Sequence, residues 1–184
     1  MNKPWGSKTV GWRSRALVLL IATVMLAIAG LSQVRPAIAS IHTYREQPGQ
    51  VTFRSQQSLR DRRDRAWQAV LFKRYRVDQP DGLYLRLVGF PGAVAVDATR
   101  PLTIDTGTAL SWQAPFALDG SVLQLPPNVG QYAMQPVLDQ IQQPIPLQIA
   151  VPLQTGGIAE LVAAPFVVEE WQALNQRHPD RNDD

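Results

Sequence analysis

The chain has 184 residues, no cysteine and a formal net charge of +3. Without a thiol it can form no disulfide, carry no lipoprotein anchor and use no thiolate chemistry. The positive charge does not indicate a nucleic-acid partner, because five of the 18 basic residues precede Ser40 and all 15 acidic residues follow it. From Ser40 onward, 13 bases face 15 acids, which gives a net charge of −2.

Residues 1–39 have the pattern of a cleaved signal peptide. A basic start is followed by an uncharged apolar run from Ala16 to Leu31 and by the cleavage motif Ala37-Ile38-Ala39. The alternative is a retained membrane anchor, but the run is shorter than the roughly 20 residues that a bilayer-spanning helix needs. The sequence therefore predicts an exported, soluble mature chain that begins at Ser40.

The mature chain is predicted to be one domain, residues 40–175, followed by a disordered polar tail, residues 176–184. Alternation of apolar and polar residues predicts strands over 41–45, 51–54, 67–77, 83–88, 93–96, 102–104, 109–113, 122–125, 145–153 and 158–162. The strand at 145–153 should lie at a sheet edge, because Pro146 and Pro152 cannot donate to a ladder.

Two segments have helical patterns. Residues 165–175 begin with Pro165 and place Val167, Val168, Trp171 and Leu174 on one stripe. A shorter helix is expected over 136–141. The fold class is therefore mainly β, a small antiparallel sandwich or partly open barrel with a C-terminal helix.

The strands at 67–77 and 83–88 are expected to form a hairpin. A five-residue loop, 78–82, would pair Val77 with Leu83 and Tyr75 with Leu85, apolar against apolar. A four-residue loop would mix the two faces, since a slip of one residue turns every side chain over.

Three segments, LFKRY (71–75), LYLRLVGFPG (83–92) and VVEEWQAL (167–174), follow the expected signal peptide. In this combination the chain resembles a family of uncharacterised exported proteins of cyanobacteria and plastids, a domain of unknown function. The resemblance implies a location in the thylakoid lumen or the periplasm. It brings no activity, cofactor or site residue with it.

The tripeptide Asp105-Thr106-Gly107 has two interpretations. Aspartic proteases of the pepsin and retroviral types present their catalytic carboxylate in such a motif, and this chain could do so only as a homodimer, because the chemistry needs two carboxylates. The simpler interpretation is a turn between two short strands, in which Asp105 accepts a hydrogen bond and Gly107 adopts a positive φ. We expect the turn and keep a homodimeric hydrolase using Asp105 as the alternative.

The other residue types favour no catalytic or metal centre. His42 lies near the start of the mature chain and His178 in its tail, so neither is expected on a fixed scaffold, and a metal site needs several placed ligands. We expect no cofactor and no metal. A carrier of a small apolar ligand, with its site in the interior of the barrel, is a further alternative.

Basic residues concentrate between Arg54 and Arg76, where eight bases accompany two acids, whereas four bases face twelve acids from Val77 onward. Under the five-residue loop, Arg76 would lie opposite Tyr84, and Arg74 opposite Arg86. A solvated face, partly neutralised by Asp61, Asp64 or the acidic second half, is one interpretation. The functional one is a docking surface for an acidic protein or an anionic membrane surface, formed by Arg62, Arg63, Arg65, Arg74, Arg76 and Arg86. The protein is accordingly expected to be a non-enzymatic binding or accessory module, on a photosynthetic membrane complex if the resemblance holds.

Overall fold

The computed structural model describes residues 41–77, 79–120 and 123–179, without the side chains of Glu46 and Gln47. The expected signal peptide, the expected first mature residue and the last five residues of the expected tail lie outside the described residues. Within the part of the chain that the structure describes, no helix is both long and apolar enough to cross a membrane.

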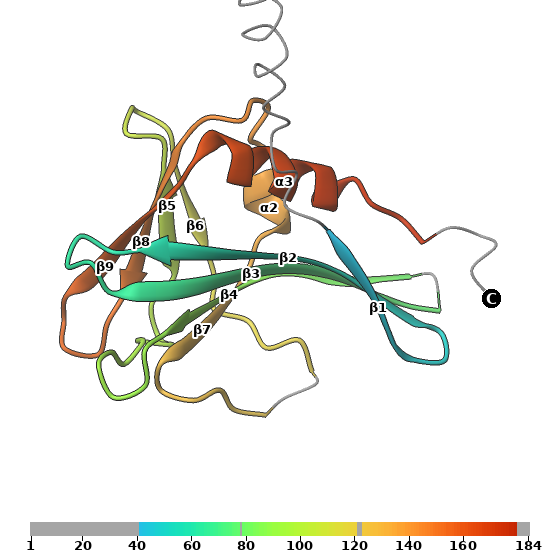
Figure 1. Ribbon diagram of the computed structural model, residues 1–184, viewed down its shortest axis with the longest axis horizontal. Helices are drawn as coiled ribbons and strands as arrows, with labels where there is room; N and C mark the ends of the chain where they lie inside the picture. Colours follow the sequence, from blue (N-terminus) through green and yellow to red (C-terminus); the bar gives the residue numbers. More distant parts are fainter. Residues whose placement is uncertain (1–40, 78, 121–122, 180–184) are drawn as a thin grey trace, which may run out of the picture. The chain divides into compact units, whose positions relative to one another are not determined.

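The first sheet has five antiparallel strands in the order β1-β2-β3-β4-β7. They are β1 (His42–Gln47), β2 (Gln50–Arg60), β3 (Ala66–Arg76), β4 (Gln79–Gly89) and β7 (Val129–Ala133). Figure 1 shows the long strands β2, β3 and β4 lying side by side, with β1 crossing at one end. The first four strands follow each other as a meander, and β7 joins them from much later in the chain.

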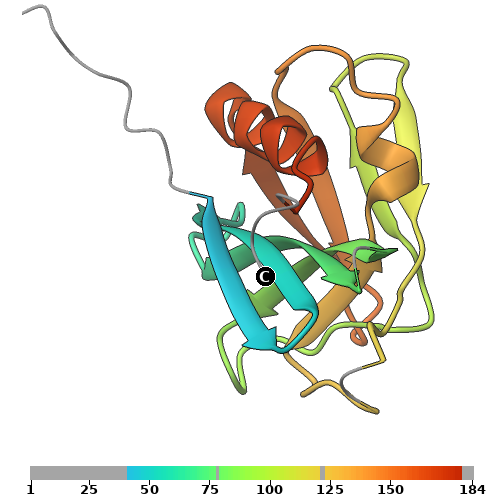
Figure 2. The ribbon, with the colours of Figure 1, turned by 90° about the vertical axis from the view of Figure 1, so that its right-hand side faces the viewer.

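The second sheet has four antiparallel strands in the order β6-β5-β8-β9. They are β5 (Leu102–Asp105), β6 (Ser111–Ala114), β8 (Leu147–Pro152) and β9 (Ile158–Ala163), accompanied by the helices α2 (Gln135–Leu138) and α3 (Pro165–Asn175). Figure 2 shows the two helices on the same side of the sheets. Two antiparallel sheets that do not close, with a C-terminal helix, confirm the predicted mainly β class.

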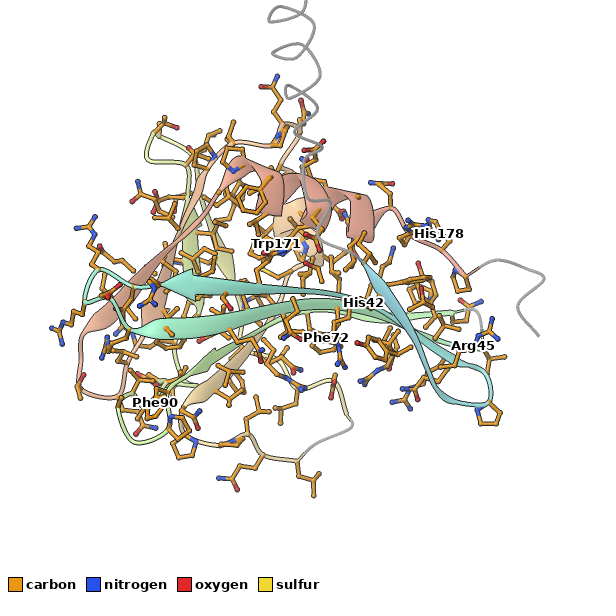
Figure 3. The ribbon with its side chains drawn as sticks, viewed as in Figure 1. His42, Arg45, Phe72, Phe90, Trp171 and His178 are labelled. Atoms are coloured by element: carbon orange, nitrogen blue, oxygen red, sulfur yellow. The ribbon has the colours of Figure 1, made fainter. Side chains whose placement is uncertain are left out.

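The core lies between the sheets. Alternate residues of the first sheet, such as Leu71 and Leu85, and of the second, such as Ile104 and Ile149, are at most 1% exposed. Each leucine or isoleucine buried in this way contributes about 1.5–3 kcal/mol. Trp171 on α3 is also fully buried and lies beneath that helix in Figure 3. The buried side chains of the two sheets and of α3 form one hydrophobic cluster.

The helix α3 has the bounds that its sequence predicts. Pro165 suits the first turn, where its missing N–H costs no intrahelical bond. At the other end, the Nζ of the buried Lys73 donates to the backbone oxygens of Asn175 (2.6 Å) and Arg177 (3.2 Å). A cation at the negative end of the helix dipole stabilises that end. Lys73 thus faces the core side of β3 and holds α3 to the sheet.

The predicted register of the β3–β4 hairpin is wrong by four residues. Leu71, not Tyr75, lies opposite Leu85, and Lys73, not Val77, lies opposite Leu83. The strand β4 begins at Gln79, so the connection is much shorter than the loop that we expected. A shift of four keeps every side chain on its predicted face, and the apolar pattern therefore cannot detect it.

Other predicted strands also differ from the structure. The strand at 145–153 is not at an edge, since β8 pairs with both β5 and β9. Its prolines do not interrupt the hydrogen bonds of the ladder, because Pro146 precedes the strand and Pro152 is its last residue. Residues 93–96 contribute only a bridge from Val96 to Leu153, and 123–125 form no strand. The strand β7 was not predicted, and the short helix lies at 135–138 instead of 136–141.

Candidate functional site

The turn between β2 and β3 is built around one buried carboxylate. Asp61 Oδ1 accepts hydrogen bonds from the backbone N–H groups of Arg63 (2.9 Å) and Arg65 (3.0 Å). Asp61 Oδ2 accepts from Arg65 Nε (2.7 Å) and from Trp67 Nε1 (3.2 Å). Because four donors converge on this side chain, the arginine-rich turn has a defined conformation.

The environment of Asp61 also changes its acidity. Burial acts to raise the pKa of the carboxyl group, but the hydrogen bonds from Arg65, Trp67 and Arg63 outweigh burial and hold the pKa below its ordinary value. Asp61 is therefore a carboxylate at neutral pH, bound to the residues around it. We had considered it as a neutralising charge on a solvated face, and it proves to be the support of the turn.

Two adjoining surface hollows, which we call the arginine groove, share Arg63 and Arg65 in their lining. The smaller, about 210 Å³, is completed by Asp61, Arg62, Ile158, Ala159 and Glu160. The larger, about 560 Å³, is completed by Pro91, Gly92, Ala93, Val94, Ala95, Pro127, Asn128, Leu153 and Thr155. Arg62 forms an ion pair with Glu160 and Arg65 one with Asp61, whereas Arg63 is exposed to solvent. The groove thus combines an exposed guanidinium with a largely apolar floor.

The six predicted docking arginines do not form one surface. Arg65 precedes β3 and Arg76 ends it, so about 33 Å of strand separates them. Figure 3 shows the same separation, with Phe90, which follows β4, at one end of the long strands and Arg45 and His178 at the other. Arg62, Arg63 and Arg65 lie together at one end of the long strands, whereas Arg74 and Arg86 lie elsewhere, around Asp119.

The expectation that Arg74 is exposed and directly opposite Arg86 is wrong. The observed register puts Arg74 opposite Gly82 and Arg86 opposite Val70. The side chain of Arg74 is 7% exposed, and its Nη1 lies 3.1 Å from Oδ2 of Asp119, a carboxylate with no exposed surface. Arg74 therefore supports the fold through an ion pair with a buried carboxylate.

The remaining two arginines also have partners within the chain. Arg86 is 31% exposed and donates to Gln131 Oε1 from Nε (2.8 Å) and Nη2 (2.6 Å), and its Nη2 lies 3.6 Å from Asp119 Oδ2. The guanidinium groups of Arg74 and Arg86 lie 5.7 and 5.2 Å from the ring centre of Phe72. Arg76 Nε donates to Asp81 at 2.9 Å. The contacts of Arg74 and Arg86 join the loop that carries Asp119 to the outer face of the first sheet.

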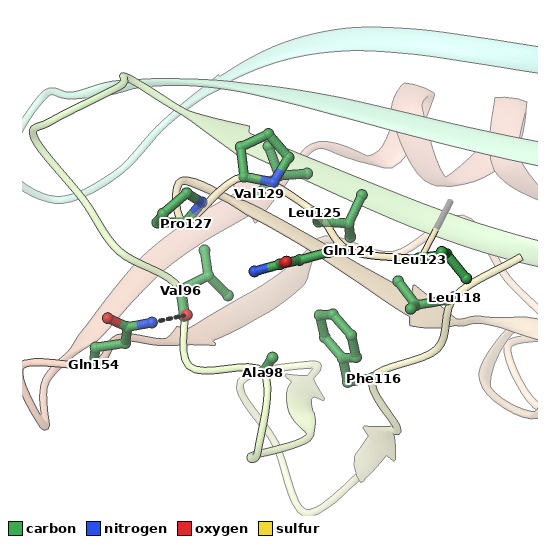
Figure 4. Close-up of a pocket in the computed structure, with 11 residues that line it drawn as sticks. Val96, Ala98, Phe116, Leu118, Leu123, Gln124, Leu125, Pro127, Val129 and Gln154 are labelled. Carbon is green, nitrogen blue, oxygen red and sulfur yellow. Dashed lines mark hydrogen bonds between the residues drawn. The ribbon is translucent and has the colours of Figure 1, made fainter. Parts of the chain in front are cut away.

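A third hollow, which we call the apolar hollow, lies beside that loop. It has a volume of about 250 Å³ and is lined by Val96, Ala98, Phe116, Leu118, Leu123, Gln124, Leu125, Pro126, Pro127, Val129 and Gln154. Figure 4 shows Phe116, Leu118 and Gln124 converging on it. This site was not predicted, because its walls come from separate segments of the chain that only the fold brings together. The one available signal was the group of leucines around the turn at Gly120.

The motif Asp105-Thr106-Gly107 forms the expected turn at the end of β5. Asp105 Oδ1 accepts a hydrogen bond from the backbone N–H of Gly107 (2.8 Å), and Gly107 has a φ of +71°. The turn interpretation is confirmed by this geometry.

The expectation that His178 has no fixed scaffold is wrong. Its Nδ1 lies 3.1 Å from the hydroxyl oxygen of Tyr75, which also donates to the backbone oxygen of Arg177 at 2.9 Å. The first residues of the expected tail are therefore attached to the end of β3. His42 is exposed on β1, with its ring 6.3 Å from that of Tyr44.

Comparison with known proteins identifies the family. A family model described as "Protein of unknown function (DUF3122)" matches residues 39–174. The chain belongs to this family. The match confirms the predicted resemblance to a domain of unknown function and covers both sheets and nearly all of α3. No curated protein and no solved structure matches the chain.

Proposed function

We propose that this DUF3122 protein is an exported, non-catalytic binding module that docks on an acidic segment of a partner protein through the arginine groove. The pattern of its first 39 residues supports export. The resemblance to exported proteins of cyanobacteria and plastids favours the thylakoid lumen or the periplasm, and a membrane-embedded photosynthetic complex as the partner.

One observation carries the docking proposal. Arg63 and Arg65 line two adjoining hollows whose floor includes Ile158, Val94 and Leu153. An arginine can bind a carboxylate with two parallel hydrogen bonds, and an apolar floor beside it can receive the aliphatic part of a neighbouring side chain. The rigid turn around Asp61 lowers the entropy lost when a partner binds. An acidic segment that also carries apolar residues fits these properties.

The test is co-sedimentation of the protein with membranes from the cells that produce it, over a series of salt concentrations. Arg63→Glu should remove most of the binding. It replaces the exposed guanidinium with a carboxylate, which repels an acidic partner. Binding of the unmodified protein should fall as salt rises, since exposed charges are screened over about 10 Å at 0.1 M ionic strength. Arg100→Glu is the matched control, because it makes the same change of charge at an exposed arginine outside the groove.

Two further measurements separate the outcomes. If the partner is a protein, membranes treated with protease should no longer bind this chain. Vesicles of anionic phospholipid that bind the protein as strongly as native membranes would contradict a protein partner and assign the groove to lipid. Equal binding of Arg63→Glu and Arg100→Glu would contradict docking through the groove.

A further inference from the structure

The apolar hollow has an uncharged lining and plays no part in docking through the arginine groove. We propose that it is a binding site for a small uncharged molecule, mainly hydrocarbon, that carries one hydrogen-bonding group. The proposal does not depend on the function proposed for the groove.

The hollow is held in shape by backbone hydrogen bonds. Val96 N donates to Pro127 O (2.7 Å), Val129 N to Pro126 O (2.9 Å) and Gln154 N to Ala95 O (2.9 Å). On the far side, the segment that carries Phe116 and Leu118 is bonded to β7, because Ala117 N donates to Gln131 O (2.9 Å) and Gln131 Nε2 donates to Ala117 O (3.0 Å). A site formed before its ligand arrives loses little conformational entropy on binding.

The lining selects an uncharged ligand. None of the described residues that line the hollow is charged, and nine of the eleven are apolar. Asp119, which follows Leu118, is directed to Arg74 and Arg86 instead. An ionic ligand would lose its hydration without gaining a counter-charge, and this costs free energy. An apolar ligand meets no such cost.

The two glutamines have different roles. Gln154 Nε2 donates to Val96 O at 3.2 Å and so belongs to the wall. The side chain of Gln124 reaches across the hollow, with its amide toward Val96 in Figure 4. Ligand pockets commonly combine an apolar lining with a few placed polar groups that orient the ligand. The amide of Gln124 would therefore meet one carbonyl or hydroxyl group.

The dimensions and the rim agree with a ligand of modest size. An apolar cavity of about 150 Å³ is enough to hold benzene, so the 250 Å³ of the hollow suits a two-ring molecule or a short branched chain. Leu123 is 97% exposed and Leu118 is 37% exposed at this site. A ligand in the hollow would remove apolar surface of these leucines from water, which favours binding.

The probe for the test is 6-propionyl-2-(dimethylamino)naphthalene, an uncharged two-ring fluorophore with one carbonyl group whose emission shifts to the blue in apolar surroundings. We expect saturable binding at one site. The variant Ala98→Phe should abolish it, because Ala98 is an exposed lining residue and a phenyl ring there fills the hollow. Leu123→Gln should weaken binding about tenfold, the effect of losing roughly one apolar side chain from the contact.

Three controls keep the result specific. Leu110→Gln changes a leucine that is 56% exposed but lies outside the hollow, and it should leave the affinity unchanged. Any probe bound by the apolar run at residues 16–31 is common to the unmodified protein and Ala98→Phe, so only the difference between them reports on the hollow. Gln124→Leu should weaken binding of the carbonyl probe but not of 2-(dimethylamino)naphthalene, which is the same molecule without the propionyl group.

The anionic fluorophore 8-anilinonaphthalene-1-sulfonate tests whether the hollow excludes a charged ligand. Its binding should be the same in Ala98→Phe and in the unmodified protein. If the carbonyl probe fails to saturate, or binds Ala98→Phe as well as the unmodified protein, the proposal is overturned. Equal effects of Leu123→Gln and Leu110→Gln would overturn it as well.

Discussion

Asp61 shows how a single side chain determines the geometry of the arginine groove. Its oxygens accept hydrogen bonds from two backbone N–H groups, one guanidinium and one indole. Arg65, which lines the groove, is held by this carboxylate, and Arg63 is held through its backbone. An acid within an arginine-rich stretch therefore need not lower the capacity to bind anions, because it can fix the positions of the bases.

The substitution Asp61→Asn tests this role. At pH 7 it should destabilise the protein by about 2 kcal/mol, because the amide loses charge-assisted bonds and turns its own N–H donors toward other donors. The pKa of Asp61 is lower in the folded state than in the unfolded state, so its contribution is complete above the unfolded pKa of about 4. It is lost as the pH falls through the folded value. The measurement is the free energy of unfolding in urea of Asp61→Asn and of the unmodified protein. The difference between them should be large at pH 7 and smaller near pH 3.

The control is Asp64→Asn in the same turn. Asp64 is a carboxylate with 83% of its side chain exposed, paired with Arg60. This substitution should change stability by less than about 0.5 kcal/mol, since exposed ion pairs contribute little. An effect of Asp61→Asn as small as that of the control would mean that the turn does not depend on the buried carboxylate.

At the scale of whole elements, the sequence patterns predicted which face of a helix or strand is buried better than they predicted which strands pair. The bounds of α3 followed from Pro165 and a helical apolar stripe, and the strands at 102–104 and 158–162 followed from alternation. The β3–β4 register was missed because a shift of four residues leaves every face unchanged. The strand β7 was missed because its sequence, VGQYA, is short and contains glycine.

The candidate site was predictable only in part, for a similar reason. Charge density along the chain identified the arginines, and three of them do lie together. It could not identify the partner of Arg74, because Asp119 is far from it in sequence and reaches it only through the loop that crosses to β7. Whether an arginine is exposed depends on that tertiary contact, which no local pattern encodes.

The ion pair reverses an expectation about Arg74. From the sequence, replacing Arg74 and Arg86 with glutamine should leave the fold intact or slightly more stable. From the structure, Arg74→Gln should destabilise it by about 3–5 kcal/mol, because the buried Asp119 loses its close counter-charge. Arg86→Gln should cost less, because Arg86 is partly exposed and lies farther from Asp119. Chemical denaturation of both variants measures the difference.

A double-substitution cycle with Asp119→Asn isolates the pair. If Arg74 and Asp119 act together, the double variant should be less destabilised than the sum of the two single variants. Additive effects, or an Arg74→Gln protein within about 0.5 kcal/mol of the unmodified one, would show that the ion pair contributes little.

At the scale of the whole molecule, the family match and the sequence pattern meet at nearly the same residue. The match begins at residue 39, and the expected mature chain begins at Ser40. The domain that folds around the two sheets is thus separate in sequence from the apolar run that precedes it.

The corresponding prediction concerns the mature protein. Intact-mass measurement on protein isolated from its own cells should show that residues 1–39 are absent, because the motif Ala37-Ile38-Ala39 is a site for signal peptidase. The protein should then be released from membranes by high salt, whereas a retained anchor would require detergent. A full-length species that only detergent extracts would contradict export as a soluble domain.

Each sheet combines strand pairs that are close in sequence with one pair that closes a long loop, β4–β7 in the first sheet and β5–β8 in the second. In the first sheet, Arg60 pairs with Ala66 across a short turn. In the second, Thr103 pairs with Ala150, nearly fifty positions later. The entropy lost on closing a loop rises with the logarithm of its length, so the second closure costs about 2 kcal/mol more than the first. The meander β1–β4 can therefore pair while the chain is still incomplete, and the second sheet depends on the arrival of β8. In the folded protein, the same long-range pairs, β4–β7 and β5–β8, hold the later part of the chain to its earlier strands.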